Sequence, residues 1–143
     1  MQKSRLRAAI LNAASRNAAL VIKNAKIVNV FTEEIIEGDV AIRDGIIIGV
    51  GSYTGKAEID AKGGYLCPGL IDGHVHIESS MAHPSRFANV ILEKGTTSII
   101  ADPHEIANVC GSDGIQYMLD QTEWLPLSVF IMVPSCVPST AFE

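Results

Sequence analysis

Two histidines separated by one residue are the strongest chemical signal in this sequence. His74 and His76 lie in the segment LIDGHVHI, which is strand-like in composition. Side chains two residues apart on a strand point to the same face. The two imidazoles are therefore placed to bind one divalent metal ion. Asp72 and Glu78 continue the same period on either side of the pair. An HxH pair by itself is weak evidence of a metal site, because such pairs also arise on surfaces and in cores.

Further polar side chains follow the next two apolar segments. The segment TTSIIA is followed by Asp102, His104 and Glu105, and LSVFIMV is followed by Ser135 and Cys136. The carboxyl ends of parallel strands meet at one edge of a sheet, where the chemistry of α/β enzymes collects. Together with the HxH pair, this pattern predicts a site at that edge. Considered alone, DPHE is also typical of a turn that begins at Asp-Pro, with Glu105 in solvent.

The spacing of apolar residues indicates the elements that position these side chains. Residues 84–93 and 112–124 are predicted as helices between the three strand-like segments, with Pro84 in a first turn and Gly95 just past a helix end. Strands that alternate with helices of this length favour βαβ units and a parallel sheet. The predicted fold class is therefore α/β.

The first half of the chain has a different pattern. Residues 1–19 combine apolar residues at helical spacing with basic residues, which predicts an amphipathic helix that packs on its own protein. An organelle-targeting peptide shares part of this pattern. Residues 20–66 are rich in Val and Ile and predict a small antiparallel β domain, in which Asp44-Gly45 forms a tight hairpin turn. The next domain is expected to begin at residue 67.

Composition excludes several classes of protein. The formal net charge is −5, from 11 Lys and Arg against 16 Asp and Glu, so a basic surface for nucleic acid is not expected. No apolar run approaches the ~20 residues of a membrane span. The three widely spaced cysteines argue against a disulfide framework and favour a reducing, cytoplasmic environment. The N-terminus lacks the pattern of a secretory signal.

Longer motifs around the HxH pair resemble a known family. The run PGLIDGHVHIESSM resembles the opening strand of the amidohydrolase superfamily, whose barrels begin with PGxxDxHxH. The segments HIESSM, GTTSIIADPHEIANVCG, GIQYML and PSCVPST together resemble the adenine deaminase family, as does the upstream LVIKNAKIVNVF…EGDVAIRDGIIIGVG. The resemblance covers residues 18–143. The HxH pair marks only the superfamily, whereas the combination of the other motifs is far more discriminating.

The resemblance implies an architecture and a reaction. It implies that residues 67–143 form the first three βα units of a TIM-type (β/α)8 barrel, and that residues 20–66 form part of a small β-sandwich domain. The implied reaction converts adenine and water to hypoxanthine and ammonia in purine salvage, which is the hydrolysis of a C–N bond in a cyclic amidine. The implied protein is cytoplasmic, acts on a small molecule, binds no nucleic acid or membrane, and is a homo-oligomer when intact.

The resemblance also implies roles for individual residues. His74 and His76 match the family's first two metal ligands. Asp102 and His104 match its second-strand motif, so Asp102 is expected to act in catalysis, by polarisation or proton handling, and His104 as an accessory metal ligand. The implied cofactor is a divalent metal, Mn(II) or Fe(II), with Zn(II) as a further option.

Two other functions stay open. Another amidohydrolase that acts on a cyclic amide shares the HxH pair but does not account for ADPHEIANV or PSCVP. The chain has 143 residues, whereas a complete barrel needs roughly 250. We therefore expect a truncated N-terminal portion of the family's fold, inactive alone because the later ligands are missing. A non-catalytic gene remnant or one subunit of a split barrel is the remaining alternative.

Overall fold

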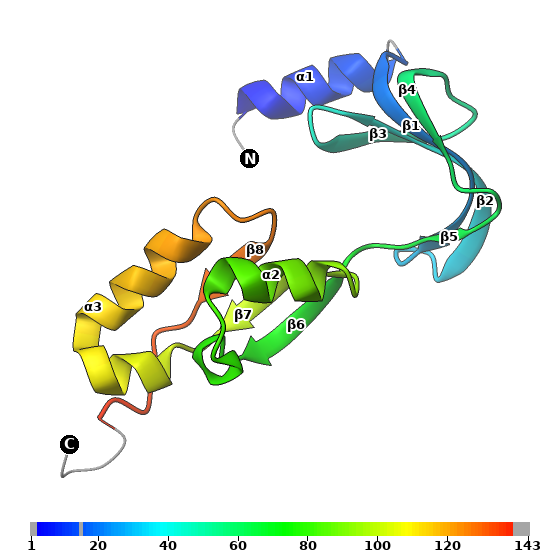
Figure 1. Ribbon diagram of the computed structural model, residues 1–143. Coiled ribbons are helices and arrows are strands. Elements are labelled where there is room, and N and C mark those ends of the chain that lie inside the picture. Colours follow the sequence, from blue (N-terminus) through cyan, green and yellow to red (C-terminus); the bar gives the residue numbers. More distant parts are fainter. Residues whose placement is uncertain (1–2, 15, 139–143) are drawn as a thin grey trace. The chain divides into compact units, whose positions relative to one another are not determined.

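The computed structural model describes residues 3–14 and 16–138, which belong to two compact units that divide between Pro68 and Gly69 (Figure 1). This division falls two residues after the predicted boundary. The first unit contains α1 (Lys3–Ala14), β1 (Ala18–Asn29), β2 (Glu34–Arg43), β3 (Ile46–Gly51), β4 (Gly55–Asp60) and β5 (Tyr65–Leu66). The second contains β6 (Leu70–Val75), the 3-10 helix η1 (Glu78–Ser80), α2 (Pro84–Leu92), β7 (Thr96–Ala101), α3 (His104–Thr122) and β8 (Ser128–Ile131).

The first unit contains one mixed sheet, which differs from the antiparallel β domain that the sequence predicts. Its order is β3-β2-β1-β4, and β5 also pairs with β1. β1 pairs with β2 antiparallel but with β4 and β5 parallel. β1 is long enough to pair with two strands along the same edge. Its first half pairs with β4 and its second half with β5. In the described part of the first unit, residues 3–14 and 16–68, all strands belong to this one sheet, so the second sheet that a sandwich requires is not found there.

The hairpin between β2 and β3 forms at the predicted turn. Asp44 and Gly45 both have positive φ, 52° and 71°. This is the backbone of a type I′ turn, whose twist matches that of the two antiparallel strands. The prediction of a tight turn at Asp44-Gly45 is confirmed.

Helix α1 is shorter than predicted and leaves its apolar residues exposed. It ends at Ala14, and β1 begins at Ala18, inside the predicted helix of residues 1–19. Ala18 is buried and pairs with Gly55. Residues 18–19, which were predicted as helix, therefore belong to the sheet. No side chain of α1 is buried, although Ala13 packs against the cluster around Val21. The expected amphipathic packing is therefore limited to the end of the helix.

A buried carboxylate ties the strands of this sheet together. Asp39 accepts hydrogen bonds from Lys23 Nζ (2.7 Å) and from the backbone N–H groups of Tyr53 (3.1 Å) and Asn24 (3.2 Å). Lys23 also donates to the Tyr53 carbonyl at 2.7 Å. The bond from Lys23 and those from the two amides lower the pKa of Asp39 below 3.8. The same ion pair raises the pKa of Lys23 above 10.5.

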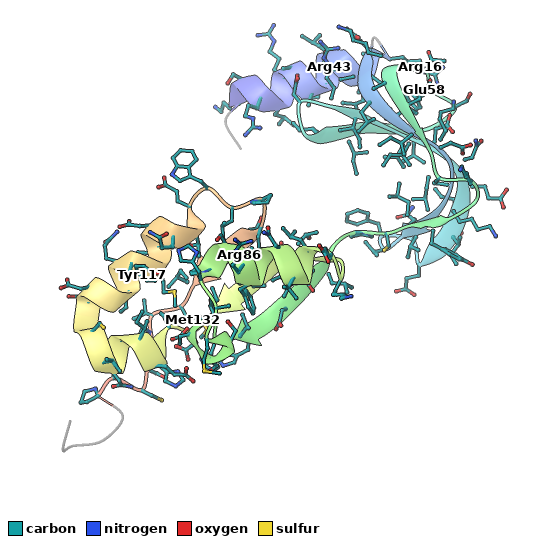
Figure 2. The ribbon with its side chains drawn as sticks, in the orientation of Figure 1. Arg16, Arg43, Glu58, Arg86, Tyr117 and Met132 are labelled. Carbon is teal, nitrogen blue, oxygen red and sulfur yellow. The ribbon has the colours of Figure 1, made fainter. Side chains whose placement is uncertain are left out.

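Two arginines hold the segment that leads from α1 into β1. The Arg16 guanidinium lies 4.9 Å from the centre of the Tyr53 ring, and Arg43 donates to the Asn17 carbonyl at 3.2 Å (Figure 2). Arg16 and Asn17 both lie between the end of α1 and the start of β1. The two contacts fix the connection that brings Ala18 into the sheet.

The second unit is a parallel α/β structure. Its sheet has the order β6-β7-β8, with parallel pairing throughout, and α2 and α3 make the two connections. The core is formed by Ile77, Ala88, Ile99, Ala101, Met118 and Leu127. The predicted α/β class and the parallel arrangement of the three strand-like segments are confirmed for this unit.

Helix α3 begins eight residues before the predicted start at residue 112. Gly111 has a non-helical backbone (φ 61°, ψ −144°), so it separates a first segment, 104–110, from the predicted one. The two segments pack closely at Gly114. A Cβ there would lie only 2.8 Å from the Ile106 carbonyl oxygen, so a glycine is needed at this position. The sequence prediction missed the first segment because DPHE has the pattern of a turn.

Among the described residues, no helix is long and apolar enough to cross a membrane.

Candidate metal centre

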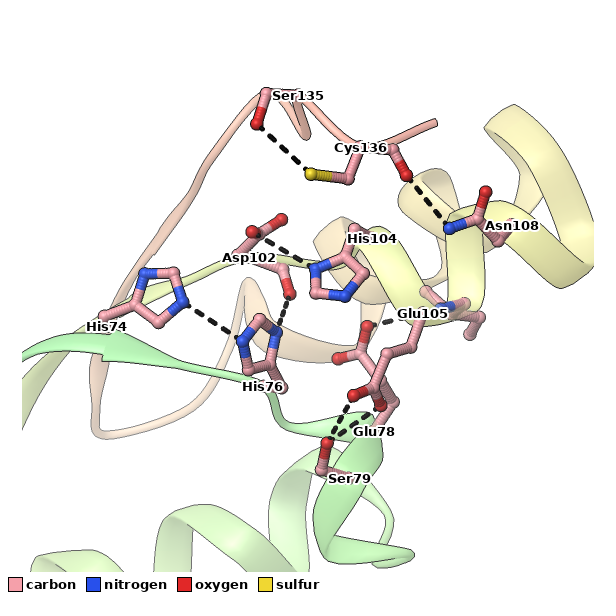
Figure 3. A network of polar contacts seen from close by, with 11 residues as sticks. His74, His76, Glu78, Ser79, Asp102, His104, Glu105, Asn108, Ser135 and Cys136 are labelled. Carbon is pink, nitrogen blue, oxygen red and sulfur yellow. Dashed lines mark hydrogen bonds and ion pairs between the residues drawn. The ribbon is translucent and has the colours of Figure 1, made fainter. Parts of the chain in front are cut away.

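The structure brings all four predicted site residues together at one edge of the second unit's sheet (Figure 3). His74 lies in β6, and His76 follows its last residue. Asp102 follows β7, and His104 is the first residue of α3. Their side chains form two overlapping groups of potential ligands, each with ligand atoms within 4.8 Å of one another. The groups are His74, His76 and Asp102, and His76, His104 and Glu105.

A hydrogen bond to the backbone fixes the tautomer of His76. Its Nδ1 lies 2.8 Å from the Asp102 backbone carbonyl, which can only accept, so Nδ1 carries the proton. In the neutral ring, Nε2 then holds a lone pair, and it lies 3.0 Å from His74 Nε2. The Asp102 N–H donates to the Val75 carbonyl at 3.0 Å, which anchors the carbonyl that orients His76. Metal-binding histidines are commonly oriented by a backbone carbonyl in this way.

The backbone of His74 is held by the side chain of Asp72. Its N–H donates to Asp72 Oδ1 at 3.1 Å, and the β6–β7 ladder is irregular between Asp72 and Val75. Asp72, which the sequence places on the same period as the histidines, is thus engaged locally and is not in either ligand group. The ring of His74 is exposed, as a ligand at the mouth of a site would be.

Asp102 is the buried carboxylate of the centre. Its Oδ2 lies 3.2 Å from His104 Nδ1, and its side chain is only 13% exposed. Its other oxygen, Oδ1, is buried and has no hydrogen-bond partner among the described residues. Burying such an atom costs free energy, and an orphaned acceptor in a native structure needs an explanation.

The DPHE segment is the start of a helix and not the turn that it resembles. Glu105 does not point freely into solvent, because both of its carboxylate oxygens lie 2.7–2.8 Å from Ser79 Oγ, which donates to them. No sequence pattern indicates this pair, since the two residues are 26 positions apart. The contact exists only because β6 and β7 are neighbours in the sheet.

The segment after β8 contributes less than the sequence suggests. The Cys136 carbonyl accepts from Asn108 Nδ2 at 3.0 Å, and the Cys136 Sγ lies 3.7 Å from Ser135 Oγ. Neither Ser135 nor Cys136 belongs to a ligand group. His83 is also outside the centre, because its Nδ1 accepts from the Ser85 N–H and caps α2.

A family model described as "Amidohydrolase family" matches residues 65–142, which is more than half of the chain. The chain belongs to the amidohydrolase family. The match includes β6, β7 and β8, and therefore all the residues that form the centre.

Curated relatives of this amidohydrolase match over most of its length. Adenine deaminase of Geobacillus kaustophilus is 65% identical over 126 residues, which is 88% of this chain and 22% of the relative. Adenine deaminase of Clostridium acetobutylicum is 59% identical over 90% of this chain and 22% of the relative. Adenine deaminase 2 of Desulfotalea psychrophila is 53% identical over 100% of this chain and 25% of the relative. The chain thus spans about a quarter or less of the length of these relatives.

A solved structure supports the fold of this amidohydrolase. The crystal structure of an N-acyl-D-glutamate deacylase from Bordetella bronchiseptica, in complex with zinc and a phosphonate inhibitor, superposes with a TM-score of 0.52 at 22% identity. The similarity covers 59% of this chain and 18% of that protein. At this identity the likeness bears on the fold alone.

The donor set of the amidohydrolase fits a divalent metal ion. The Nε2 atoms of His74 and His76 lie 3.0 Å apart, and Asp102 Oδ1 is a buried acceptor for which residues 3–14 and 16–138 supply no partner. Imidazole and carboxylate are the ligands of catalytic zinc and related metals. A cation bound between the two imidazole nitrogens would lie beside the Asp102 carboxylate, since the three side chains offer ligand atoms within 4.8 Å of one another.

Proposed function

We propose that this sequence forms the first part of the metal centre of an adenine deaminase, which converts adenine and water to hypoxanthine and ammonia. The observation that carries the proposal is the His76 ring, whose proton lies on Nδ1 and whose Nε2 lies 3.0 Å from His74 Nε2, in one ligand group with the Asp102 carboxylate. The relatives named adenine deaminase, at 53–65% identity, support this substrate over a cyclic amide.

The proposed roles follow from the contacts. His74 and His76 would hold the metal through Nε2, and the Asp102 carbonyl keeps the His76 ring in the required orientation. When bound, a divalent metal ion lowers the pKa of water and so supplies a nucleophile near neutral pH. We favour Mn(II) or Fe(II), with Zn(II) as the third option. His104 would be an accessory ligand through Nε2, since its Nδ1 is directed to Asp102.

Asp102 is the proposed catalytic residue. Hydrolysis at C6 of adenine forms a C–O bond, breaks the C–N bond to the amino group and requires protons to move from water to the departing ammonia. Asp102 Oδ1 is a buried acceptor on the carboxylate that shares a ligand group with His74 and His76, so it is suited to hold one of these protons. Its partner His104, 3.2 Å from Oδ2, keeps the carboxylate in place.

The architecture proposed for the whole protein is a TIM-type barrel that begins with β6, β7 and β8. The parallel order of these strands supports it, and so does the position of the centre at their carboxyl ends. Residues 18–66 would belong to a second, β-rich domain that becomes a sandwich in the whole protein. We further propose a homo-oligomeric, cytoplasmic enzyme of purine salvage.

Hypoxanthine production from adenine tests the function. The purified chain is assayed with Mn(II) or Fe(II), beside a chimera in which it replaces the matching segment of Geobacillus kaustophilus adenine deaminase. We expect no activity from the chain alone, because a metal-activated water needs further ligands, and activity from the chimera. A chimera that is inactive with adenine but hydrolyses a cyclic amide would favour the other amidohydrolase function. A chimera that is folded but inactive on both would favour a non-catalytic remnant.

A further inference from the structure

The loop after β6 is joined to the first turn of α3 by two polar contacts. Glu78 Oε1 accepts from the Ile106 backbone N–H at 3.3 Å. The next residue, Ser79, donates to the Glu105 carboxylate at 2.7–2.8 Å. Figure 3 shows both glutamates and Ser79 beside His76 and His104. These contacts connect the segment that carries the HxH pair with the segment that carries DPHE.

The first turn of α3 lacks a cap of its own. Pro103 occupies the N-cap position, and its side chain makes no capping hydrogen bond because it has no acceptor atom. Ile106 is the third residue of the helix, and its N–H is one that an N-cap side chain usually accepts from. Glu78 supplies this acceptor from 28 residues away. Its negative charge also suits the positive end of the helix dipole.

This turn needs outside support. The break at Gly111 leaves only residues 104–110 in the first segment of α3, and a helical segment of this length is unstable by itself. His104 is the first residue of the segment. Its ring lies 4.6 Å from the His76 ring, centre to centre, and its Nδ1 lies 3.2 Å from Asp102. Fraying of the turn would therefore displace His104 from both neighbours.

We propose that Glu78 is a positioning residue of the metal centre, which caps α3 from the end of β6 and thereby holds His104 beside His76 and Asp102. The link to metal binding rests on the proposed function. The Ser79–Glu105 hydrogen bond is a second connection between the same two segments. In this arrangement, Glu78 acts through His104 and does not bind the metal itself.

Two substitutions separate capping from metal ligation. Glu78→Ala removes the acceptor for Ile106, whereas Glu78→Gln keeps an acceptor oxygen of the same reach but removes the charge. Glu123→Ala is the matched control, since Glu123 is an exposed glutamate at the C-cap position, at the other end of α3. Each variant is compared with the unsubstituted chain for hydrogen exchange of the Ile106 amide without metal, and for Zn(II) affinity by equilibrium dialysis.

We expect Glu78→Ala to raise the exchange rate of the Ile106 amide at least ~10-fold, because the first turn opens locally. We expect its Zn(II) affinity to fall ~10–100-fold, as for other groups that orient metal ligands. Glu78→Gln should retain most of both properties, and Glu123→Ala should change neither.

Three results would overturn the proposal. The first is unchanged Ile106 exchange in Glu78→Ala. The second is faster exchange with unchanged zinc affinity, which would make the cap purely structural. The third is a Glu78→Gln chain with protected Ile106 but lost zinc binding, which would make Glu78 a ligand. If the unsubstituted chain binds no zinc, the proposed metal centre fails, whereas the exchange rates, measured without metal, still decide whether Glu78 caps α3.

Discussion

Asp39 in the first unit and Asp102 in the second are both buried carboxylates, but their surroundings are opposite. Asp39 accepts one bond from Lys23 and two from backbone amides, so both of its oxygens are satisfied. Asp102 has His104 on one oxygen and no partner on the other in the part of the chain that the structure describes. A fully paired carboxylate stabilises the fold, whereas a buried acceptor without a partner costs stability and is retained where it serves a ligand or a reaction. The comparison therefore assigns Asp39 a structural role and supports the functional role that we propose for Asp102.

The largest expected effect comes from removing a histidine beside Asp102. We expect His76→Ala to weaken Zn(II) binding by the purified chain at least ~100-fold, because it removes a direct ligand and not merely a group that orients one. Equilibrium dialysis with metal analysis measures this. His83→Ala is the control, since it removes an imidazole that caps α2. Equal losses in the two variants would contradict a site at His76.

The next effect separates catalysis from stability at Asp102. In the chimera with the Geobacillus relative, we expect Asp102→Asn to lower kcat for adenine ~10²–10⁴-fold, the range for losing a general acid–base group. Its thermal midpoint should stay the same or rise, because a neutral amide is cheaper to bury than a carboxylate. Steady-state kinetics and calorimetry measure the two quantities. A lower midpoint with an unchanged kcat would make Asp102 structural, like Asp39.

Asp39 should show the reverse pattern. We expect Asp39→Ala to lower the thermal midpoint of the chain, because it leaves Lys23 and two backbone N–H groups without their acceptor. Zn(II) affinity should not change, since the ligands belong to the other unit. Glu37→Ala, at an exposed position of the same strand, is the control. Loss of zinc binding in Asp39→Ala would show that the two units are coupled.

The smallest effect is the pH dependence of the Lys23–Asp39 pair. The pKa of Asp39 is lowered, so its contribution to stability is present above pH 3.8 and is lost as pH falls through the folded value. The pKa of Lys23 is raised, so its contribution is present below pH 10.5 and is lost as pH rises through the folded value.

Urea unfolding midpoints measured across pH test this dependence. We expect Asp39→Asn to flatten both the acid and the alkaline limbs of the stability profile relative to the unsubstituted chain. Asp44→Asn is the control, since the Asp44 side chain is 73% exposed. Identical profiles for Asp39→Asn and the unsubstituted chain would show that the ion pair contributes nothing measurable.

The sequence determined the elements whose local chemistry is decisive. Asp44-Gly45 favours a type I′ turn by itself, and the alternation of strands and helices after residue 69 is enough to predict a parallel sheet. The HxH pair and the polar residues after the next strand were expected at one edge of that sheet, and the structure brings them together there. These features depend on periodicity and turn preference, which neighbouring residues set.

Tertiary structure alone decided the features that depend on distant residues. The parallel partners of β1 follow from its length and from the path of the chain, and the first segment of α3 depends on an acceptor from Glu78. The tautomer of His76 follows from its hydrogen bond to the Asp102 carbonyl. The packing of the sheet and α3 buries Asp102 Oδ1 without a partner among the described residues. No sequence pattern encodes these contacts, because each joins residues that only the packed sheet brings within hydrogen-bond distance.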